Sequence, residues 1–193
     1  MISEASRTIL ITGTSGEIGF HLAAHFLGDG WTVMGIDKCD PVEGDMLPGL
    51  VSRRCDLSNA LEAAQAIDDL ASSHGAFDVV INCAGKIANA PLVSFGEQGW
   101  TVHQFSLWDE VLSSCLTAAF NTTAISVRHM VEARKKGVIV NVSSVCARGT
   151  PGQAAYSAAK AGLNGLTLAL AKELGPLGIR VVGLLQVTST RNP

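Results

Sequence analysis

Short apolar runs rich in β-branched residues alternate with longer segments of helical pattern along most of this 193-residue chain. The six short runs cover residues 8–12, 32–36, 51–55, 77–82, 138–142 and 179–184. The helical patterns cover residues 17–27, 60–73, 108–133 and 155–174. Because such alternation is typical of βαβ units, we predict an α/β fold, a doubly wound parallel sheet with helices on both faces. The less regular stretch 86–107 is expected to be an ordered loop with a short helix rather than a domain boundary, so residues 1–193 should form a single domain.

Composition excludes several classes of protein. The net charge of −3 offers no basic surface for nucleic acid, and no apolar run reaches the ~18 residues that a membrane span needs. No signal pattern opens the chain, and the five cysteines contain no Cys-x-x-Cys pair, which favours reduced thiols. We therefore expect a cytoplasmic protein that contacts neither nucleic acid nor membrane. His21 and His25 are four residues apart but lack a third ligand, so no metal site is predicted.

A glycine-rich segment, Thr12-Gly13-Thr14-Ser15-Gly16-Glu17-Ile18-Gly19, connects the first predicted strand to the first predicted helix. Glycines let a backbone turn sharply and approach a pyrophosphate, whose charge is favoured by the N–H groups at a helix start. The position between strand and helix is what makes this pattern informative. We expect it to bind a dinucleotide through Gly13, Ser15, Gly16, Glu17, Ile18 and Gly19.

Asp37 ends the second predicted strand, eighteen residues beyond Gly19. A carboxylate at this point can accept a hydrogen bond from a ribose 2′-hydroxyl and would repel a phosphate there. This favours NAD over NADP as the cofactor. Lys38, directly after it, keeps NADP open as the alternative.

Tyr156 and Lys160 are four residues apart in a predicted helix, so both side chains share one face. A neighbouring ammonium favours the phenolate and should draw the pKa of the tyrosine from ~10 toward neutrality. Such a tyrosine can exchange a proton with an alcohol or ketone while a hydride is exchanged nearby.

Together with further motifs, these segments resemble the short-chain dehydrogenase/reductase family over nearly the whole chain. The further motifs are Cys55-Asp56-Leu57-Ser58, Asn82-Cys83-Ala84-Gly85 and Asn141-Val142-Ser143-Ser144. The resemblance implies a Rossmann-type fold and an NAD or NADP cofactor. It adds to the expected cofactor contacts Asp56, Leu57, Asn82, Ala84, Gly85, Tyr156 and Lys160.

The resemblance also implies catalytic roles. Tyr156 would be the general acid or base, while Lys160 would lower its pKa and bind the nicotinamide ribose. A serine would hydrogen-bond the substrate oxygen. The family spacing of thirteen residues before the tyrosine favours Ser143, whereas the pattern Ser-Ser-Val-x-Ala favours Ser144. We predict Ser144.

Four positions depart from the family pattern. Glu17 stands where the standard branch has a glycine, Cys115 where it has a catalytic-site asparagine, and Leu185-Gln186 where it has Pro-Gly. The sequence then ends at Pro193, without the family's usual C-terminal lid and last strand, which leaves residues 179–184 at the sheet edge. Two explanations stay open, and we favour a shortened or altered complete reductase over a natural short form whose pocket a partner completes.

We therefore predict an NAD(P)-dependent oxidoreductase that interconverts a secondary alcohol and a ketone. Its partners would be a small-molecule alcohol or ketone and further copies of itself, since the resemblance implies a homodimer or homotetramer. The alternative is a catalytically impaired nucleotide-binding or scaffold protein of the same fold.

Overall fold

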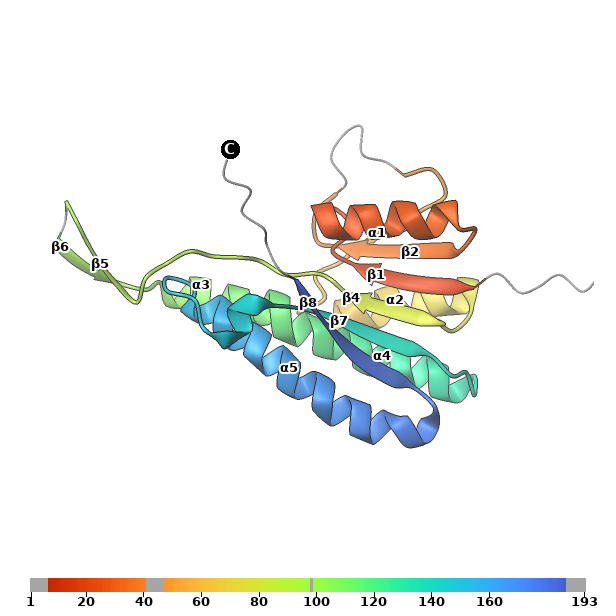
Figure 1. Ribbon diagram of the computed structural model, residues 1–193. Coiled ribbons are helices and arrows are strands. Elements are labelled where there is room, and N and C mark those ends of the chain that lie inside the picture. Colours follow the sequence, from red (N-terminus) through yellow and green to blue (C-terminus); the bar gives the residue numbers. More distant parts are fainter. Residues whose placement is uncertain (1–6, 41–46, 98, 187–193) are drawn as a thin grey trace, which may run out of the picture.

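The computed structural model describes residues 7–40, 47–97 and 99–186, and its centre is a six-stranded sheet (Figure 1). The strands are β1 (Thr8–Thr12), β2 (Thr32–Asp37), β3 (Val51–Arg54), β4 (Val79–Asn82), β7 (Val138–Ser144) and β8 (Arg180–Gln186). They are hydrogen-bonded in the order β3-β2-β1-β4-β7-β8, and every pairing is parallel. The predicted doubly wound parallel sheet is confirmed.

Helices cover both faces of this sheet (Figure 1). The helix α1 (Glu17–Gly28) packs on one face, and α2 (Ala60–His74), α4 (Ala118–Glu132) and α5 (Ala154–Leu174) pack on the other. The alternation of side chains along a strand produces the two layers. In β1, Ile9 and Ile11 join the apolar cluster beneath α1, while Leu10 joins the larger cluster on the opposite face.

The order of the strands also determines where a ligand can bind. Strands β1 and β4 are neighbours, but the chain leaves β1 toward β2 on one side and leaves β4 toward β7 on the other. Connections that diverge in this way leave a crevice at the carboxyl ends of the two strands. The Thr12 hydroxyl lies at this point and accepts hydrogen bonds from the backbone N–H groups of Cys83 (3.1 Å) and Ala84 (3.0 Å).

The predicted helix at 108–133 differs from the observed structure. The segment begins earlier, as α3 (Phe105–Leu112), and continues through a π-helical turn, η1 (Ser113–Thr117), into α4. Apolar periodicity does not reveal an inserted residue of this kind, and π-turns occur often at functional sites. Cys115 lies within this turn. Two 3₁₀ turns, η2 (Val145–Arg148) and η3 (Gly175–Leu177), flank α5.

The stretch 86–107 was predicted as a loop with a short helix, but it contains an antiparallel hairpin. Strand β5 (Val93–Gly96) pairs with β6 (Gly99–Val102), and the hairpin projects from the body of the molecule (Figure 1). β-branched and aromatic side chains favour this pairing, and the rings of Phe95 and Trp100 meet with centroids 5.1 Å apart. Helical structure starts only at Phe105.

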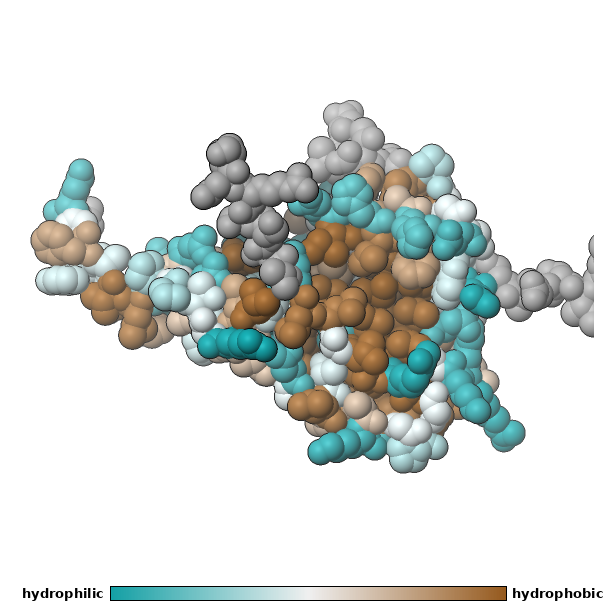
Figure 2. All heavy atoms as spheres, in the orientation of Figure 1, coloured by the Kyte–Doolittle hydropathy of each residue, from teal (hydrophilic) through white to brown (hydrophobic). Residues whose placement is uncertain are grey.

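The expected sheet edge is found at β8. Its residues Val182 and Leu184 are exposed on the α1 side, where Figure 2 shows apolar side chains gathered below α1. The predicted absence of a lid and a last strand concerns residues 187–193, which lie outside the described residues. In the described part of the chain, none of the helices is long and apolar enough to cross a membrane.

Candidate active site

A cavity of about 740 Å³ lies along the carboxyl ends of β1, β2, β4 and β7. Its volume is within the range of about 300–1,000 Å³ that is usual for small-molecule sites. Nearly all the predicted site residues line it, namely Gly13, Ser15, Gly16, Glu17, Ile18, Gly19, Asp37, Asp56, Leu57, Ala84, Gly85, Tyr156 and Lys160. The fold therefore brings together motifs that are far apart in the sequence.

The glycines of the loop allow backbone approaches that a side chain would prevent. Gly13 has a φ of +77°, and a Cβ there would lie 2.8 Å from the Cα of Ala84. A Cβ on Gly19 would lie 2.1 Å from the carbonyl oxygen of Gly13. Atoms cannot approach so closely, so both positions require glycine. The loop is thereby folded tightly against the start of α1.

The start of α1 faces the cavity. Gly16 is the N-cap residue and supplies no side-chain cap, and the first N–H groups of a helix have no partner within the helix. This end carries the positive side of the helix dipole and suits an anion such as a pyrophosphate. Glu17 is exposed in this first turn, so its carboxylate can point toward water rather than toward a bound phosphate.

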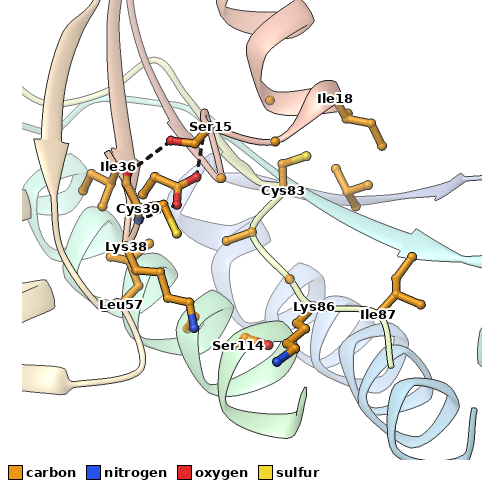
Figure 3. A pocket seen from close by; sticks show the side chains of 18 of the residues that line it. Ser15, Ile18, Ile36, Lys38, Cys39, Leu57, Cys83, Lys86, Ile87 and Ser114 are labelled. Atoms are coloured by element: carbon orange, nitrogen blue, oxygen red, sulfur yellow. Dashed lines mark hydrogen bonds between the residues drawn. The ribbon is translucent and has the colours of Figure 1, made fainter. Parts of the chain in front are cut away.

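Asp37 is held in place at the end of β2. Its carboxylate accepts hydrogen bonds from the backbone N–H groups of Ser15 (2.9 Å) and Cys39 (3.0 Å), and the Ser15 hydroxyl donates to the Cys39 carbonyl at 3.2 Å (Figure 3). An ionised carboxylate has about four acceptor positions, so it can also accept from a ribose hydroxyl. Asp56, which also lines the cavity, accepts hydrogen bonds from the backbone and side chain of Ser58, and bonding to the Ser58 side chain is the main cause that lowers the pKa of Asp56.

Asn82 was predicted as a cofactor contact, but it does not line the cavity. It is buried, and its side-chain amide donates to Thr123 Oγ1 (2.9 Å) and Asn141 Oδ1 (2.8 Å). Asn141 in turn donates to Thr167 Oγ1 at 2.8 Å. This buried network ties β4 and β7 to α4 and α5, so Asn82 supports the site from beneath.

Tyr156 and Lys160 lie on α5, and both are buried, with 5% and 4% of their surfaces exposed. The Lys160 ammonium donates to the backbone carbonyl of Val142 at 2.7 Å and lies 5.5 Å from the centroid of the Tyr156 ring. Burial lowers the pKa of Lys160, and the nearby Cys115 and Cys83 thiols oppose this effect. The predicted sharing of a face is confirmed.

The predicted lowering of the tyrosine pKa is not found in the structure. Burial raises the pKa of Tyr156, and Cys115 adds to the effect, whereas hydrogen bonding with the Ser144 side chain lowers it. The physical reason is that removal from water penalises the phenolate, while the ammonium of Lys160 is engaged by the Val142 carbonyl. The phenol is therefore protonated at neutral pH.

The structure distinguishes the two candidate serines. The Ser143 hydroxyl donates to the backbone carbonyl of Lys160 at 3.4 Å and is buried. The Ser144 hydroxyl accepts the backbone N–H of Cys146 at 3.2 Å, and its side chain is the one that affects the pKa of Tyr156. Ser144 is not among the residues that line the cavity, but it lies beside the phenol that does.

Cys115 is buried in the π-turn, next to the tyrosine–lysine pair. Its thiol donates to the backbone carbonyl of Lys86 at 3.6 Å, and a Cβ on Gly85 would lie 2.9 Å from its sulfur. It packs in the same apolar cluster as Tyr156. A thiol is a weak donor, so the hydrogen bond that it makes to this loop is weak.

Sequence reasoning missed several side chains that line the cavity, chiefly Lys86, Glu110 and Ser114. Lys86 could have been found, because it directly follows the motif at residues 82–85. Glu110 lies 24 residues beyond Lys86, and no local pattern connects the two.

Comparisons with known proteins agree with this geometry. The family model of short chain dehydrogenases matches residues 7–188. An uncharacterized oxidoreductase of Schizosaccharomyces pombe is 38% identical over 175 residues, which are 91% of this chain and 64% of that protein. The 3-oxoacyl-acyl-carrier-protein reductase of Thermotoga maritima is 34% identical over 183 residues, with 91% of this chain and 71% of the relative covered. This chain thus spans about two thirds of the length of these relatives.

Solved structures give the same result. The crystal structure of an NAD⁺-bound xylitol dehydrogenase matches with a TM-score of 0.82 and 26% sequence identity. The match covers 93% of this chain and 70% of the other.

Proposed function

Because the chain belongs to the short-chain dehydrogenase family, we propose that it is an NAD(P)-dependent oxidoreductase that interconverts a secondary alcohol and a ketone. We further propose that residues 1–193 act as a single dinucleotide-binding unit, with NAD as the cofactor and NADP as the alternative. The xylitol dehydrogenase that this chain resembles was solved with NAD⁺, which supports the choice of NAD.

One observation carries the proposal, namely that a single cavity is lined both by the glycine loop and by the tyrosine–lysine pair. The loop residues fit a dinucleotide, because the tight turn at Gly13 and Gly19 leads directly into α1, whose N-terminus has no side-chain cap and lines the cavity. Asp37 is an acceptor at the end of β2, whereas Tyr156 lies on α5, which packs against β7, and β1 and β4 lie between β2 and β7 in the sheet. A dinucleotide needs these features in this order along one channel.

The bound nicotinamide would supply or accept the hydride. Tyr156, protonated because of its burial, would give its proton to the oxygen of a ketone. Ser144 would donate a hydrogen bond to the same oxygen and stabilise its developing charge. Lys160, held by its hydrogen bond to the Val142 carbonyl, would place a positive charge next to the phenol. After turnover it would return a proton to the Tyr156 phenolate.

The test is turnover of a panel of secondary alcohols and ketones with each dinucleotide. Tyr156 is the single tyrosine of the chain, so Tyr156→Phe removes its hydroxyl and leaves no other phenol that could replace it. The variant should still bind the dinucleotide and should turn over about 10²–10⁴-fold more slowly. Undiminished turnover would refute the role of Tyr156, and calorimetry without dinucleotide binding would refute the function itself.

The weak thiol hydrogen bond of Cys115 favours a second candidate, a nucleotide-binding protein with impaired turnover. Dinucleotide binding without turnover on the whole panel would support this candidate. Cys115→Asn, which restores a strong hydrogen-bonding side chain, should then raise the rate.

Self-association is also part of the proposal. Large apolar side chains are exposed on α4 and α5, with Phe120 52% and Leu168 65% exposed, which supports an interface between copies of the chain. Light scattering should give a dimer or a tetramer, and Leu168→Glu should shift it toward the monomer. The cytoplasmic location stays a prediction from the sequence.

A further inference from the structure

Glu110 joins two lysines across the cavity. From α3, its carboxylate reaches the Lys86 ammonium at 2.8 Å and the Lys38 ammonium at 3.7 Å. Lys38 follows β2 and Lys86 follows β4, so three separate elements meet at this carboxylate. Figure 3 shows the two lysine side chains reaching from opposite walls toward the same helical segment, near Ser114.

These lysines matter because they bring positive charge to the same cavity as Asp37. Among the described residues that line the cavity, the cationic side chains are Lys38, Lys86 and Lys160. Lys160 lies beside Tyr156 and is held by the Val142 carbonyl. Of these three, the two lysines paired with Glu110 remain to neutralise a phosphate bound next to Asp37, and Lys38 directly follows Asp37 in the chain.

A further cation near this end is likewise paired. Arg54 pairs with the Asp40 carboxylate at 2.9 Å and donates from Nε to the backbone carbonyl of Lys38 at 3.2 Å. Its guanidinium therefore holds the backbone of Lys38 while being neutralised by Asp40. The charges around Asp37 are balanced before any ligand enters.

We propose that Glu110 increases the preference of this chain for NAD over NADP, because its carboxylate competes with a 2′-phosphate for Lys38 and Lys86. The cavity then accepts NAD in preference to NADP, because Asp37 repels the phosphate and Glu110 weakens the compensation that the two lysines can give. This inference rests on the proposed function, since it requires that the cavity binds a dinucleotide.

The charge state of Glu110 supports this role. Hydrogen bonding to Lys86 lowers the pKa of Glu110, and the charges of both lysines act in the same direction, so the carboxylate stays ionised at neutral pH. The three side chains are 41–50% exposed, and ion pairs of this kind contribute little to the stability of a fold. Removing the carboxylate should therefore free the lysines without unfolding the protein.

The experiment measures the Kd of NAD and of NADP for the whole chain by calorimetry at low salt. Glu110→Gln should tighten NADP binding by about five- to ten-fold, while the Kd of NAD changes by less than about two-fold. The matched control is Asp109→Asn, which removes the same charge from the neighbouring position of α3 and should leave the ratio of the two constants as it is. Adding both Lys38→Met and Lys86→Met to Glu110→Gln should abolish the gain.

An unchanged ratio in Glu110→Gln would overturn the specificity role while leaving the proposed function intact. An equal gain in Asp109→Asn would also overturn it, because net charge alone would then explain the result. A parent chain that binds neither dinucleotide would overturn both this inference and the proposed function.

Discussion

The ammonium of Lys160 donates a hydrogen bond to the backbone carbonyl of Val142 at 2.7 Å, which joins the first third of α5 to the carboxyl half of β7. The lysine is 4% exposed and lies 5.5 Å from the centroid of the Tyr156 ring. A cation in such a place is unfavourable for folding, because desolvation outweighs one hydrogen bond. The burial of Lys160 beside the Tyr156 phenol is the strongest indication of a functional site in this molecule.

The cost of burying Lys160 gives a prediction about pH. Its pKa in the folded chain is lowered by burial, so on acidification the unfolded chain takes up this proton first. The stability that depends on Lys160 is therefore present above the ordinary lysine value of 10.5 and is lost as the pH falls through the lower folded value. Lys160→Met should be more stable than the parent at neutral pH, by about 1 kcal/mol or ~2–4 °C in Tm, and this advantage should shrink toward pH 10.5.

Thermal unfolding at a series of pH values measures the difference in Tm between Lys160→Met and the parent. Lys172→Met, an exposed lysine of the same helix, serves as the control and should show no comparable gain. A variant at Lys160 that is less stable than the parent at neutral pH would contradict the prediction.

The pKa of Tyr156 can be read directly, since the chain has one tyrosine. Because burial raises this pKa in the folded protein, phenolate absorbance should appear at higher pH than in the urea-unfolded chain, which titrates near 10.0. Because the pKa of Tyr156 is higher in the folded than in the unfolded chain, the stability that comes from the protonated phenol is present below pH 10.0. It is lost as the pH rises through the higher folded value. Rapid pH jumps record the folded state before it unfolds, and titration at or below the unfolded value would disprove the assignment.

The two serines should respond differently to replacement by alanine. Ser144→Ala should reduce kcat by about 10²–10³-fold and raise the pKa of Tyr156 further, since hydrogen bonding with Ser144 lowers that pKa. Ser143→Ala removes a hydrogen bond to the Lys160 carbonyl and should cost about 1 kcal/mol of stability with a smaller loss of kcat. The opposite ranking of the two rates would transfer the catalytic role to Ser143.

The tight glycine loop gives a prediction about stability and binding. Gly19→Ala would place a Cβ 2.1 Å from the Gly13 carbonyl oxygen, so it should cost about 1–3 kcal/mol or more and weaken dinucleotide binding at least ~10-fold. Gly165→Ala on α5 is the matched control, because a Cβ there meets nothing within 4 Å. It should stabilise the helix by up to ~1 kcal/mol and leave binding unchanged. Similar behaviour of the two variants, measured by denaturant unfolding and calorimetry, would count against the role of the loop.

Much of the fold and of the site could be predicted from local pattern. Strand and helix periodicities mark the elements of the sheet, and the observed bounds of α1, α2 and α5 differ from the predicted ones by no more than one residue at either end. The glycine loop and the spacing of Tyr156 and Lys160 are also local features. The backbone conformation of a glycine-rich turn and the shared face of residues four apart in a helix both depend on residues that are close in the sequence. The hairpin at 93–102 was missed, since its glycines and aromatics are equally compatible with a loop.

Sequence alone thus determined the parallel α/β fold, the phosphate-binding loop and the shared face of Tyr156 and Lys160. Only the tertiary structure decided that Lys160 donates to Val142, that Asn82 belongs to a buried network, and that Glu110 meets Lys38 and Lys86. The physical reason is that these contacts join residues on different elements. Their distances, their exposure to water and the resulting pKa values depend on how the elements pack, which no local pattern encodes.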